Sequence, residues 1–219
     1  MGDHGDLVLP ALALLFDCDG VLVDSDPSVV AAWSRWGTHY ALDAAEVVAL
    51  VHGRRAADTV AHLIETDRQA EARALVNRFE IEDAGTVTAI PGADALLRSL
   101  PADRWAVVTS ALSALARARI TAAALPFPDV LVTADLVSRG KPDPEGYLMA
   151  AQLLGQPPGA CIVLEDAVEG VAAARAAGVG AVVGVGRRVV DTEVDALVED
   201  LTALSWTAQG LLCRPSRSS

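Results

Sequence analysis

Short apolar runs recur along the chain, and segments with helical periodicity separate most of them. The apolar runs, several of them rich in β-branched residues, cover residues 11–16, 104–109, 130–133, 160–164 and 180–185. Helical periodicity is clearest at residues 93–100, 145–154 and 168–177. Strands that are apolar nearly throughout and alternate with helices indicate a parallel sheet covered on both faces. The pattern therefore predicts a doubly wound parallel α/β core, with an active site beyond the carboxyl ends of its strands.

The interval between the first two predicted strands is too long for one crossover helix. Helical patterns there cover residues 27–40, 43–52, 56–66 and 69–79. Pro27 suits a first helical position, Asp43 an N-cap and Gly53 a helix stop. We expect an inserted α-helical cap, a core in two pieces, two hinges and a frayed tail. The respective residues are 25–86 for the cap, 1–24 and 87–219 for the core, 20–26 and 85–92 for the hinges, and 207–219 for the tail.

The composition is that of a globular protein. The 219 residues are 52% hydrophobic and 21% charged, which argues against disorder. Their apolar runs are too short to span a bilayer. The first six residues are acidic where a secretory signal is basic, so we expect a cytoplasmic location. Cys18, Cys161 and Cys213 are an odd number without metal-ligand spacing, which indicates no disulfide framework. Cys18 and Cys161 lie in apolar, strand-like contexts, which predicts buried free thiols there.

The net charge of −12 argues against a nucleic-acid partner, because nucleic acids are bound by basic faces. An acidic protein can still bind a small phosphate ester where positive charge is concentrated locally. The chain contains one lysine, Lys141, and every other fixed cation is an arginine. The position of that lysine is therefore informative.

Two carboxylates follow the first predicted strand, in the sequence Asp17-Cys18-Asp19-Gly20. Residues i and i+2 of an extended segment point to the same side, so Asp17 and Asp19 can face one small volume. Two close negative charges raise each other's pKa, and a divalent cation such as Mg²⁺ relieves that repulsion. For this motif in isolation, a solvated acidic turn is the more common interpretation.

Polar groups also follow three later strands. Thr109 and Ser110 offer hydroxyls and backbone N–H groups for a phosphoryl oxygen. Lys141 follows the strand at residues 130–133, and Glu165 and Asp166 end the strand at residues 160–164. Each group also has a purely structural interpretation as a helix N-cap or its neighbour. The positions with that alternative are Thr109, Ser110, Asp143 with Pro144, and Asp166.

These four stretches together resemble the ordered motifs of the haloacid dehalogenase superfamily. They are Phe16-Asp17-Cys18-Asp19-Gly20-Val21-Leu22-Val23-Asp24-Ser25, Val107-Val108-Thr109-Ser110, Gly140-Lys141-Pro142-Asp143-Pro144 and Leu164-Glu165-Asp166-Ala167-Val168-Glu169-Gly170. The likeness covers residues 12–186 and implies a Rossmann-like core with a helical cap. Within the superfamily, the chain is most similar to sugar- and polyol-phosphate phosphatases of the β-phosphoglucomutase-like group. The stretches that carry this closer similarity are residues 24–33, 51–54, 90–92 and 105–110.

The resemblance implies roles for individual residues. Asp17 would be the nucleophile and Asp19 the general acid and base. Mg²⁺ would be held by Asp17, Asp166 and the backbone carbonyl of Asp19, with Glu165 in support. Lys141, Thr109 and Ser110 would hold the remaining phosphoryl oxygens of a small phosphorylated metabolite. A monomer that binds neither nucleic acid nor membrane is compatible with these features.

Other chemistries of the same superfamily fit less well. Hydrolytic dehalogenases generally lack the second aspartate, so Asp19 disfavours them. Phosphonatases need a cap lysine, and residues 27–84 contain none. Phosphohexomutases share every core motif and stay open as an alternative, as does, more remotely, a non-catalytic sensor of phosphorylated ligands.

The cap contributes residues whose roles the sequence leaves open. His52, Arg54 and Arg55 lie at a predicted helix boundary, where a closing cap could present them to a sugar hydroxyl or a phosphate. As an equal alternative, they are cations at a helix C-terminus. Trp33 and Trp36 lie at i and i+3, a spacing more typical of packing than of a sugar-binding platform.

Overall fold

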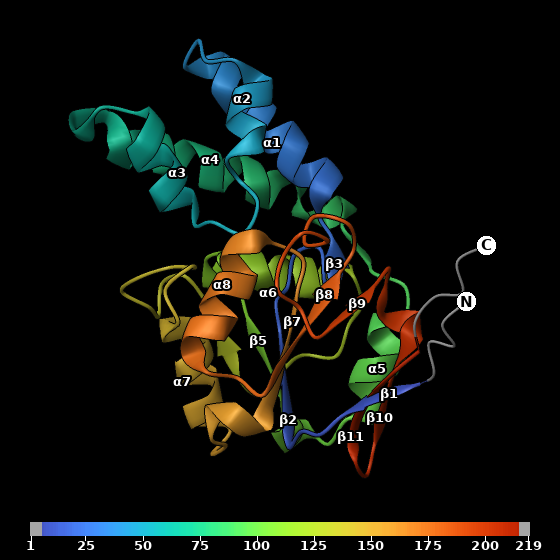
Figure 1. Cartoon of the computed structure of the whole chain (residues 1–219). Helices are drawn as coiled ribbons and strands as arrows, with labels where there is room; N and C mark the ends of the chain where they lie inside the picture. The colour runs from blue at the N-terminus through green and yellow to red at the C-terminus, as the bar shows by residue number, and fades with distance from the viewer. Residues whose placement is uncertain (1–5, 215–219) are drawn as a thin grey trace.

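The structure is a computed structural model that describes residues 6–214 (Figure 1). Within that range six parallel strands form a central sheet in the order β6-β5-β2-β7-β8-β9. The strands are β2 (Ala13–Phe16), β5 (Trp105–Val108), β6 (Leu131–Val132), β7 (Cys161–Glu165), β8 (Ala181–Val185) and β9 (Ala196–Val198). The predicted parallel α/β core is therefore confirmed, with β9 as an edge strand that the sequence did not predict.

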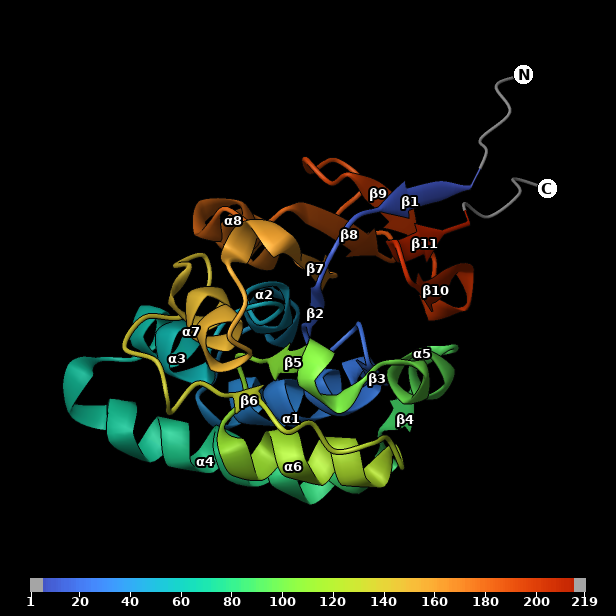
Figure 2. The same ribbon diagram turned by 90° about the horizontal axis from the view of Figure 1, so that it is seen from below.

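Helices cover both faces of this sheet, as the nearly continuous apolar strands require (Figure 2). Side chains alternate along β2, so Leu14 and Phe16 lie in one cluster and Ala13 and Leu15 in the other. The first cluster includes residues of α5 (Ala93–Ser99) and α6 (Ser113–Ala122). The second includes residues of α7 (Glu145–Leu153) and α8 (Val168–Ala177). All of the β2 side chains are buried, which fixes the position of the residues that follow this strand.

Four helices that follow β2 form a separate layer, which lies beyond the carboxyl ends of the sheet strands (Figure 1). They are α1 (Asp26–His39), α2 (Ala44–Ala49), α3 (Ala56–Leu63) and α4 (Gln69–Asp83), with short 3₁₀ turns at Thr66–Arg68 and Ala84–Thr86. Trp33 and Trp36 belong to a separate apolar cluster of this layer, and Trp36 Nε1 donates to the Ala72 carbonyl at 2.9 Å. The packing interpretation is thus confirmed for Trp36, whereas Trp33 packs in the same cluster and also lines the cavity described below.

Local signals at the start of the helices were mostly correct. The Asp43 side chain caps α2 by accepting from two backbone N–H groups, as predicted. Pro27 lies in the first turn of α1, but the helix begins one residue earlier at Asp26. The predicted end of α2 at residue 52 was wrong, because the helix ends at Ala49. Gly53 follows in a turn with φ 75°, a conformation that glycine adopts readily.

The two segments that connect the α/β core to the helical cap pair with each other. β3 (Val23–Asp24) and β4 (Thr88–Ala89) form a short antiparallel ribbon with Val23 opposite Ala89. These strands fall in the stretches that we expect to be hinges. The domain boundaries themselves stay a prediction.

The expectation of a frayed tail was wrong for residues 207–214. β11 (Gly210–Cys213) is the central strand of an antiparallel sheet, between β1 (Leu7–Leu9) and β10 (Leu204–Thr207). Leu211 is fully buried and belongs to the larger apolar cluster of the core. Apolar burial therefore orders this segment, while residues 215–219 lie outside the described part of the chain.

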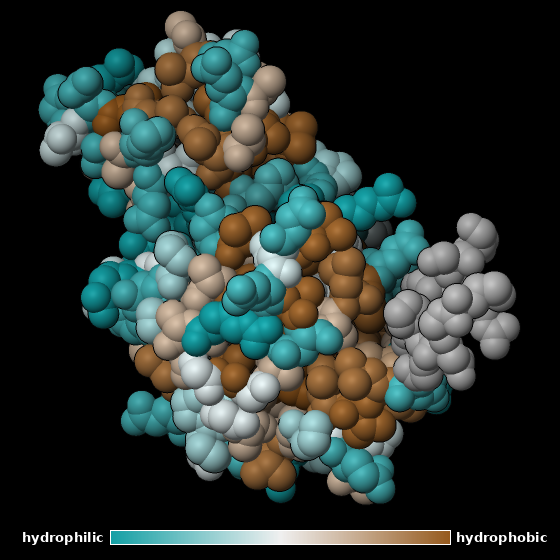
Figure 3. All heavy atoms as spheres, viewed as in Figure 1, coloured by the Kyte–Doolittle hydropathy of each residue, from teal (hydrophilic) through white to brown (hydrophobic). Residues whose placement is uncertain are grey.

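Two further expectations concern the chain as a whole. Cys18 and Cys161 are buried free thiols, as predicted, and Cys213 is a buried free thiol as well. Among the helices of residues 6–214, none combines the length and the apolar character needed to cross a membrane. Polar and apolar residues are interspersed on the face that Figure 3 shows.

Candidate active site

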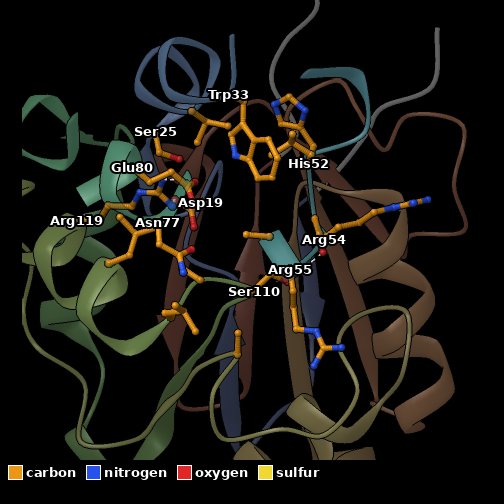
Figure 4. Close-up of a pocket in the computed structure, with 18 of the residues that line it drawn as sticks. Asp19, Ser25, Trp33, His52, Arg54, Arg55, Asn77, Glu80, Ser110 and Arg119 are labelled. Atoms are coloured by element: carbon orange, nitrogen blue, oxygen red, sulfur yellow. Dashed lines mark hydrogen bonds and ion pairs between the residues drawn. The ribbon is translucent and has the colours of Figure 1, made fainter. Parts of the chain in front are cut away.

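The carboxyl ends of the central strands meet beneath the cap at a cavity of about 290 Å³ (Figure 4). Core residues from the segments after β2, β5 and β7 form its floor, and cap residues form its roof. The polar residues that line it are Asp17, Asp19, Ser25, Asp26, His52, Arg54, Arg55, Arg73, Asn77, Glu80, Ser110, Arg119 and Asp166. The cavity therefore lies where the sequence predicts an active site.

Asp17 and Lys141 are in direct contact at the bottom of this region. Lys141 Nζ lies 2.5 Å from Asp17 Oδ1 and 2.5 Å from Glu165 Oε1. Burial would lower the pKa of Lys141, but the two carboxylates outweigh that effect and raise it well above its usual range. Burial also raises the pKa of Asp17, and the nearby Lys141 ammonium offsets only part of that rise. The only lysine of the chain is thus a buried, charged partner of the predicted nucleophile.

Glu165 is the hydrogen-bonding hub of the site and is completely buried. Its Oε1 accepts from Lys141 Nζ and, at 2.7 Å, from the Tyr147 hydroxyl. Its Oε2 accepts from the backbone N–H groups of Asp166 at 2.9 Å and Ala167 at 3.1 Å. Because all four donors converge on one side chain, Glu165 fixes both the lysine and the turn that presents Asp166.

Asp17, Glu165 and Asp166 form a carboxylate cluster that fits a divalent cation. One ligand atom from each lies within 4.8 Å of the others, and all three residues are buried. Burial, followed by repulsion from Glu165, raises the pKa of Asp166 to about 7. Buried carboxylates that repel one another are the oxygen donors that Mg²⁺ binds. Gly20 lies against Asp166 at φ 81°, so a larger residue there would clash with that carboxylate.

Asp19 lies apart from this cluster, and its side chain faces an arginine. Asp19 Oδ1 is 2.9 Å from Arg119 Nη1, and Arg119 Nη2 is 3.2 Å from Glu80 Oε1. Arg119 comes from α6 and Glu80 from the cap helix α4. Sequence reasoning missed both residues, because nothing in a local pattern tells which arginine of α6 is buried against the cap.

The hydroxyl residues after β5 lie between the floor and the cap. Thr109 Oγ1 accepts from the Ala111 N–H at 3.0 Å, and the Ser110 hydroxyl donates to the Gly53 carbonyl at 3.0 Å. The alternative interpretation of these two residues as a helix N-cap was wrong, because α6 begins at Ser113.

The other N-cap interpretations fare similarly. The cap position of α8 is Ala167, so Asp166 is not an N-cap. The α7 helix begins at Glu145 and its cap position is Pro144, one residue later than predicted. Asp143 nevertheless accepts from the Glu145 N–H at 3.0 Å and stabilises that helix start.

The predicted cap residues separate into two groups. His52 and Trp33 lie at the cavity in Figure 4, and His52 Nε2 is 3.4 Å from Asp26 Oδ1. The Arg54 guanidinium points away from the cavity and pairs with Glu169 of α8 at 3.0 Å. The Arg55 guanidinium also points away (Figure 4) and pairs with neighbouring polar groups, Asp58 and the Ser138 carbonyl. The helix C-terminal interpretation of these cations was wrong, because α2 ends before them.

Sequence reasoning also missed Arg188, which follows β8. Its guanidinium pairs with Asp166 Oδ2 through Nη1 and with Asp26 Oδ2 through Nη2. Arg73 and Asn77, one turn apart on α4, line the roof of the cavity and were missed as well. Their helical spacing from Glu80 was visible in the sequence, but the face of α4 that meets the core was not.

Comparisons with known proteins agree with this geometry. A family model described as haloacid dehalogenase-like hydrolase matches residues 12–178. Hexitol phosphatase A of Escherichia coli is 47% identical over 169 residues, which are 75% of this chain and 78% of that protein. Fructose-1-phosphate phosphatase YqaB of Escherichia coli is 34% identical over 176 residues, or 77% of this chain and 94% of that protein.

A solved structure shares the fold. The β-phosphoglucomutase of Clostridium difficile superimposes with a TM-score of 0.77 at 21% identity, over 87% of this chain and 92% of that one. At that identity the likeness concerns the fold alone.

Proposed function

This chain belongs to the haloacid dehalogenase-like hydrolases and is a phosphoric monoester hydrolase, and from that premise we propose that it hydrolyses small sugar or polyol phosphates through a phosphorylated Asp17. The observation that carries the proposal is the buried contact between Lys141 and Asp17, the carboxylate that lines the cavity. The substrate class is supported by the relatives, one named a hexitol phosphatase and one a fructose-1-phosphate phosphatase.

In the first step Asp17 acts as the nucleophile. One of its carboxylate oxygens bonds to phosphorus while the bond from phosphorus to the substrate's alcohol oxygen breaks. The Asp19 carboxyl gives its proton to that leaving oxygen, so the product is a neutral alcohol. The cavity supports this division of roles, since Asp17 is buried on its floor and the Asp19 side chain is 28% exposed on its wall.

In the second step the phosphorylated Asp17 is hydrolysed. The Asp19 carboxylate accepts a proton from a water molecule, whose oxygen bonds to phosphorus as the bond to Asp17 breaks. Inorganic phosphate leaves, and both aspartates return to their starting protonation states. The two steps together consume one phosphate monoester and one water molecule.

The positive charge of Lys141 next to Asp17 would offset the charge of the phosphoryl group. Lys141 is held between Asp17 and Glu165, so its ammonium group is already in place before the reaction. Thr109 and Ser110 follow β5 and bring hydroxyl groups to the same edge of the sheet. We propose that these three residues bind the phosphoryl oxygens.

The carboxylate cluster would hold Mg²⁺ through Asp17 and Asp166, together with the Asp19 carbonyl oxygen. When bound, Mg²⁺ would stabilise the negative charge that develops on the phosphoryl oxygens. Glu165 is engaged by four donors, so we assign it to the support of Lys141 and Asp166. Arg188 would have to share Asp166 with the ion.

A phosphohexomutase is the second candidate, because the chain shares its fold with a β-phosphoglucomutase. A mutase returns a phosphoryl group to a sugar, whereas a phosphatase transfers it to water. The two named phosphatases with which the chain shares 34% and 47% identity favour the hydrolase. A cytoplasmic location and a monomeric state stay predictions.

A panel of phosphorylated metabolites, with colorimetric detection of released phosphate and added Mg²⁺, tests the proposal. We expect the fastest release from hexitol and hexose phosphates, and slow release from nucleotides and phosphopeptides. Asp17→Asn should abolish release, while Asp58→Asn, a cap surface substitution, should leave it unchanged. Equal release by the parent and Asp17→Asn would refute the mechanism, and a preference for nucleotides would refute the substrate class.

A further inference from the structure

A buried arginine joins the cap to the predicted acid–base residue. Arg119 on α6 is 3% exposed, and Glu80 on the cap helix α4 is 7% exposed. The guanidinium reaches Glu80 with Nη2 at 3.2 Å and Asp19 with Nη1 at 2.9 Å (Figure 4). One planar group therefore bridges two carboxylates that lie on different layers of the molecule.

The charges of this trio depend on one another. Burial alone would lower the pKa of Arg119, but the carboxylates of Asp19 and Glu80 outweigh it and raise that pKa, so the guanidinium is charged. A buried charge without partners is strongly unfavourable, and removing one partner of a buried pair costs about 3–5 kcal/mol. Arg119 is consequently held in place by both carboxylates, one of which arrives with the cap.

From this geometry, and on the basis of the proposed function, we infer that Arg119 is a positioning residue for Asp19 that is fully ordered only when Glu80 of the cap is docked. Arg119 Nη1 forms an ion pair with Oδ1 of Asp19, and this charge contact holds the carboxyl group at the wall of the cavity. Proton transfer requires hydrogen-bond reach, and a displacement of about 1 Å can cost about 10²-fold in rate.

The cap contact makes this orientation conditional. Helix α4 packs directly against α6, so any separation of cap and core removes Glu80 from Arg119. Arg119 would then be held by Asp19 alone, and the Arg119 guanidinium could turn away from the cavity. Acid–base competence would thus be coupled to cap closure over a substrate.

Substrates with different leaving groups distinguish this role from a structural one. A polyol alkoxide needs a proton as it leaves, whereas p-nitrophenolate is stable without one. We expect Arg119→Gln to lower kcat for hexitol phosphate by about 10²-fold, within the range of general acid catalysis. The same variant should lower kcat for p-nitrophenyl phosphate by less than about 5-fold, because the other catalytic groups are untouched.

Two further variants complete the test. Glu80→Gln keeps the shape of the side chain and should lower kcat for hexitol phosphate by about 5–10-fold, with the smaller effect again on p-nitrophenyl phosphate. Glu169→Gln is the matched control, because it removes another ion pair between cap and core, that with Arg54. It should change kcat for both substrates by the same small factor.

A double-mutant cycle examines whether Arg119 acts through Asp19. In the Asp19→Asn background the Arg119→Gln substitution should add less than about 3-fold to the loss with hexitol phosphate, because the group it positions is already gone. Additive losses, or equal losses with both substrates in Arg119→Gln and Glu80→Gln, would overturn the inference. If Arg119→Gln does not fold, the Glu80→Gln comparison decides the question alone. A parent enzyme that released phosphate from neither substrate would instead overturn the proposed function.

Discussion

Replacing Glu165 by Gln should destabilise the protein more than removing any single one of its hydrogen bonds. The two oxygens of Glu165 accept from two donors each, namely Lys141 Nζ with the Tyr147 hydroxyl and the N–H groups of Asp166 and Ala167. An amide has one oxygen and one NH₂ group. Whichever way the Gln side chain turns, two donors therefore lose their acceptor.

The magnitude follows from burial. Glu165 has no exposed surface, and each buried donor left without a partner costs about 1–3 kcal/mol. Lys141 also loses one of its two countercharges but keeps Asp17. We therefore expect Glu165→Gln to lower the free energy of unfolding by about 3–5 kcal/mol, a large part of the 5–15 kcal/mol typical of a protein.

Two matched variants calibrate this value. Tyr147→Phe removes one donor to the carboxylate and should cost about 1.5–3 kcal/mol. Glu169→Gln removes an exposed ion pair and should cost less than about 1 kcal/mol. Urea unfolding, followed by circular dichroism and by the fluorescence of the four tryptophans at a fixed Mg²⁺ concentration, measures all three. The reasoning fails if Glu165→Gln is no more destabilising than Tyr147→Phe, or if it matches Glu169→Gln.

Three further predictions concern the carboxylate cluster and the antiparallel sheet of β1, β11 and β10. Asp166→Asn should raise the free energy of unfolding of the Mg²⁺-free protein at pH 8 by about 1–3 kcal/mol, because it removes a carboxylate whose pKa burial raises to about 7. This gain in stability should shrink as the pH falls from 7 toward 4. An Asn variant that is no more stable than the parent at pH 8 would contradict the prediction. Mg²⁺ affinity, measured by calorimetry, should fall about tenfold per pH unit below about pH 7, since protons then compete for Asp166; a pH-independent affinity between 5 and 7 would exclude Asp166 as a ligand. Ending the chain at Gln209 removes β11 with its buried Leu211 and Cys213 and should lower stability by about 3–6 kcal/mol, as read by the thermal midpoint, whereas an unchanged midpoint would mean that β11 adds nothing.

The sequence predicts the central sheet well because its strands are buried on both faces. The apolar runs at β2, β5, β7 and β8 stand out from the helices between them, so their order and type follow directly. β11 was missed because its four residues lie near a polar chain end and carry no clear alternation. It pairs with its neighbour β10 and also with β1, a segment roughly 200 residues earlier in the chain, and no local pattern contains that second pairing.

The candidate site divides in the same way. Asp17, Lys141 and Asp166 follow strands of one parallel sheet, so their convergence at one edge is predictable from topology. Arg119 and Glu80 meet only because the cap helix α4 packs on α6, and that docking depends on the complete fold. The residues that the sequence reveals belong to the sheet, whereas those it hides lie where the cap meets the core.

The phosphorylation of Asp17 tests the central claim most directly. Asp19→Asn should slow the second step, so mixing this variant with p-nitrophenyl phosphate and Mg²⁺ and quenching in acid should trap the phosphorylated chain. Mass spectrometry is expected to find one added phosphoryl group on the peptide that contains Asp17, and none when Asp17 is also replaced by Asn. A phosphoryl group on another residue, or release of phosphate with no labelled protein at any quench time, would contradict nucleophilic catalysis by Asp17.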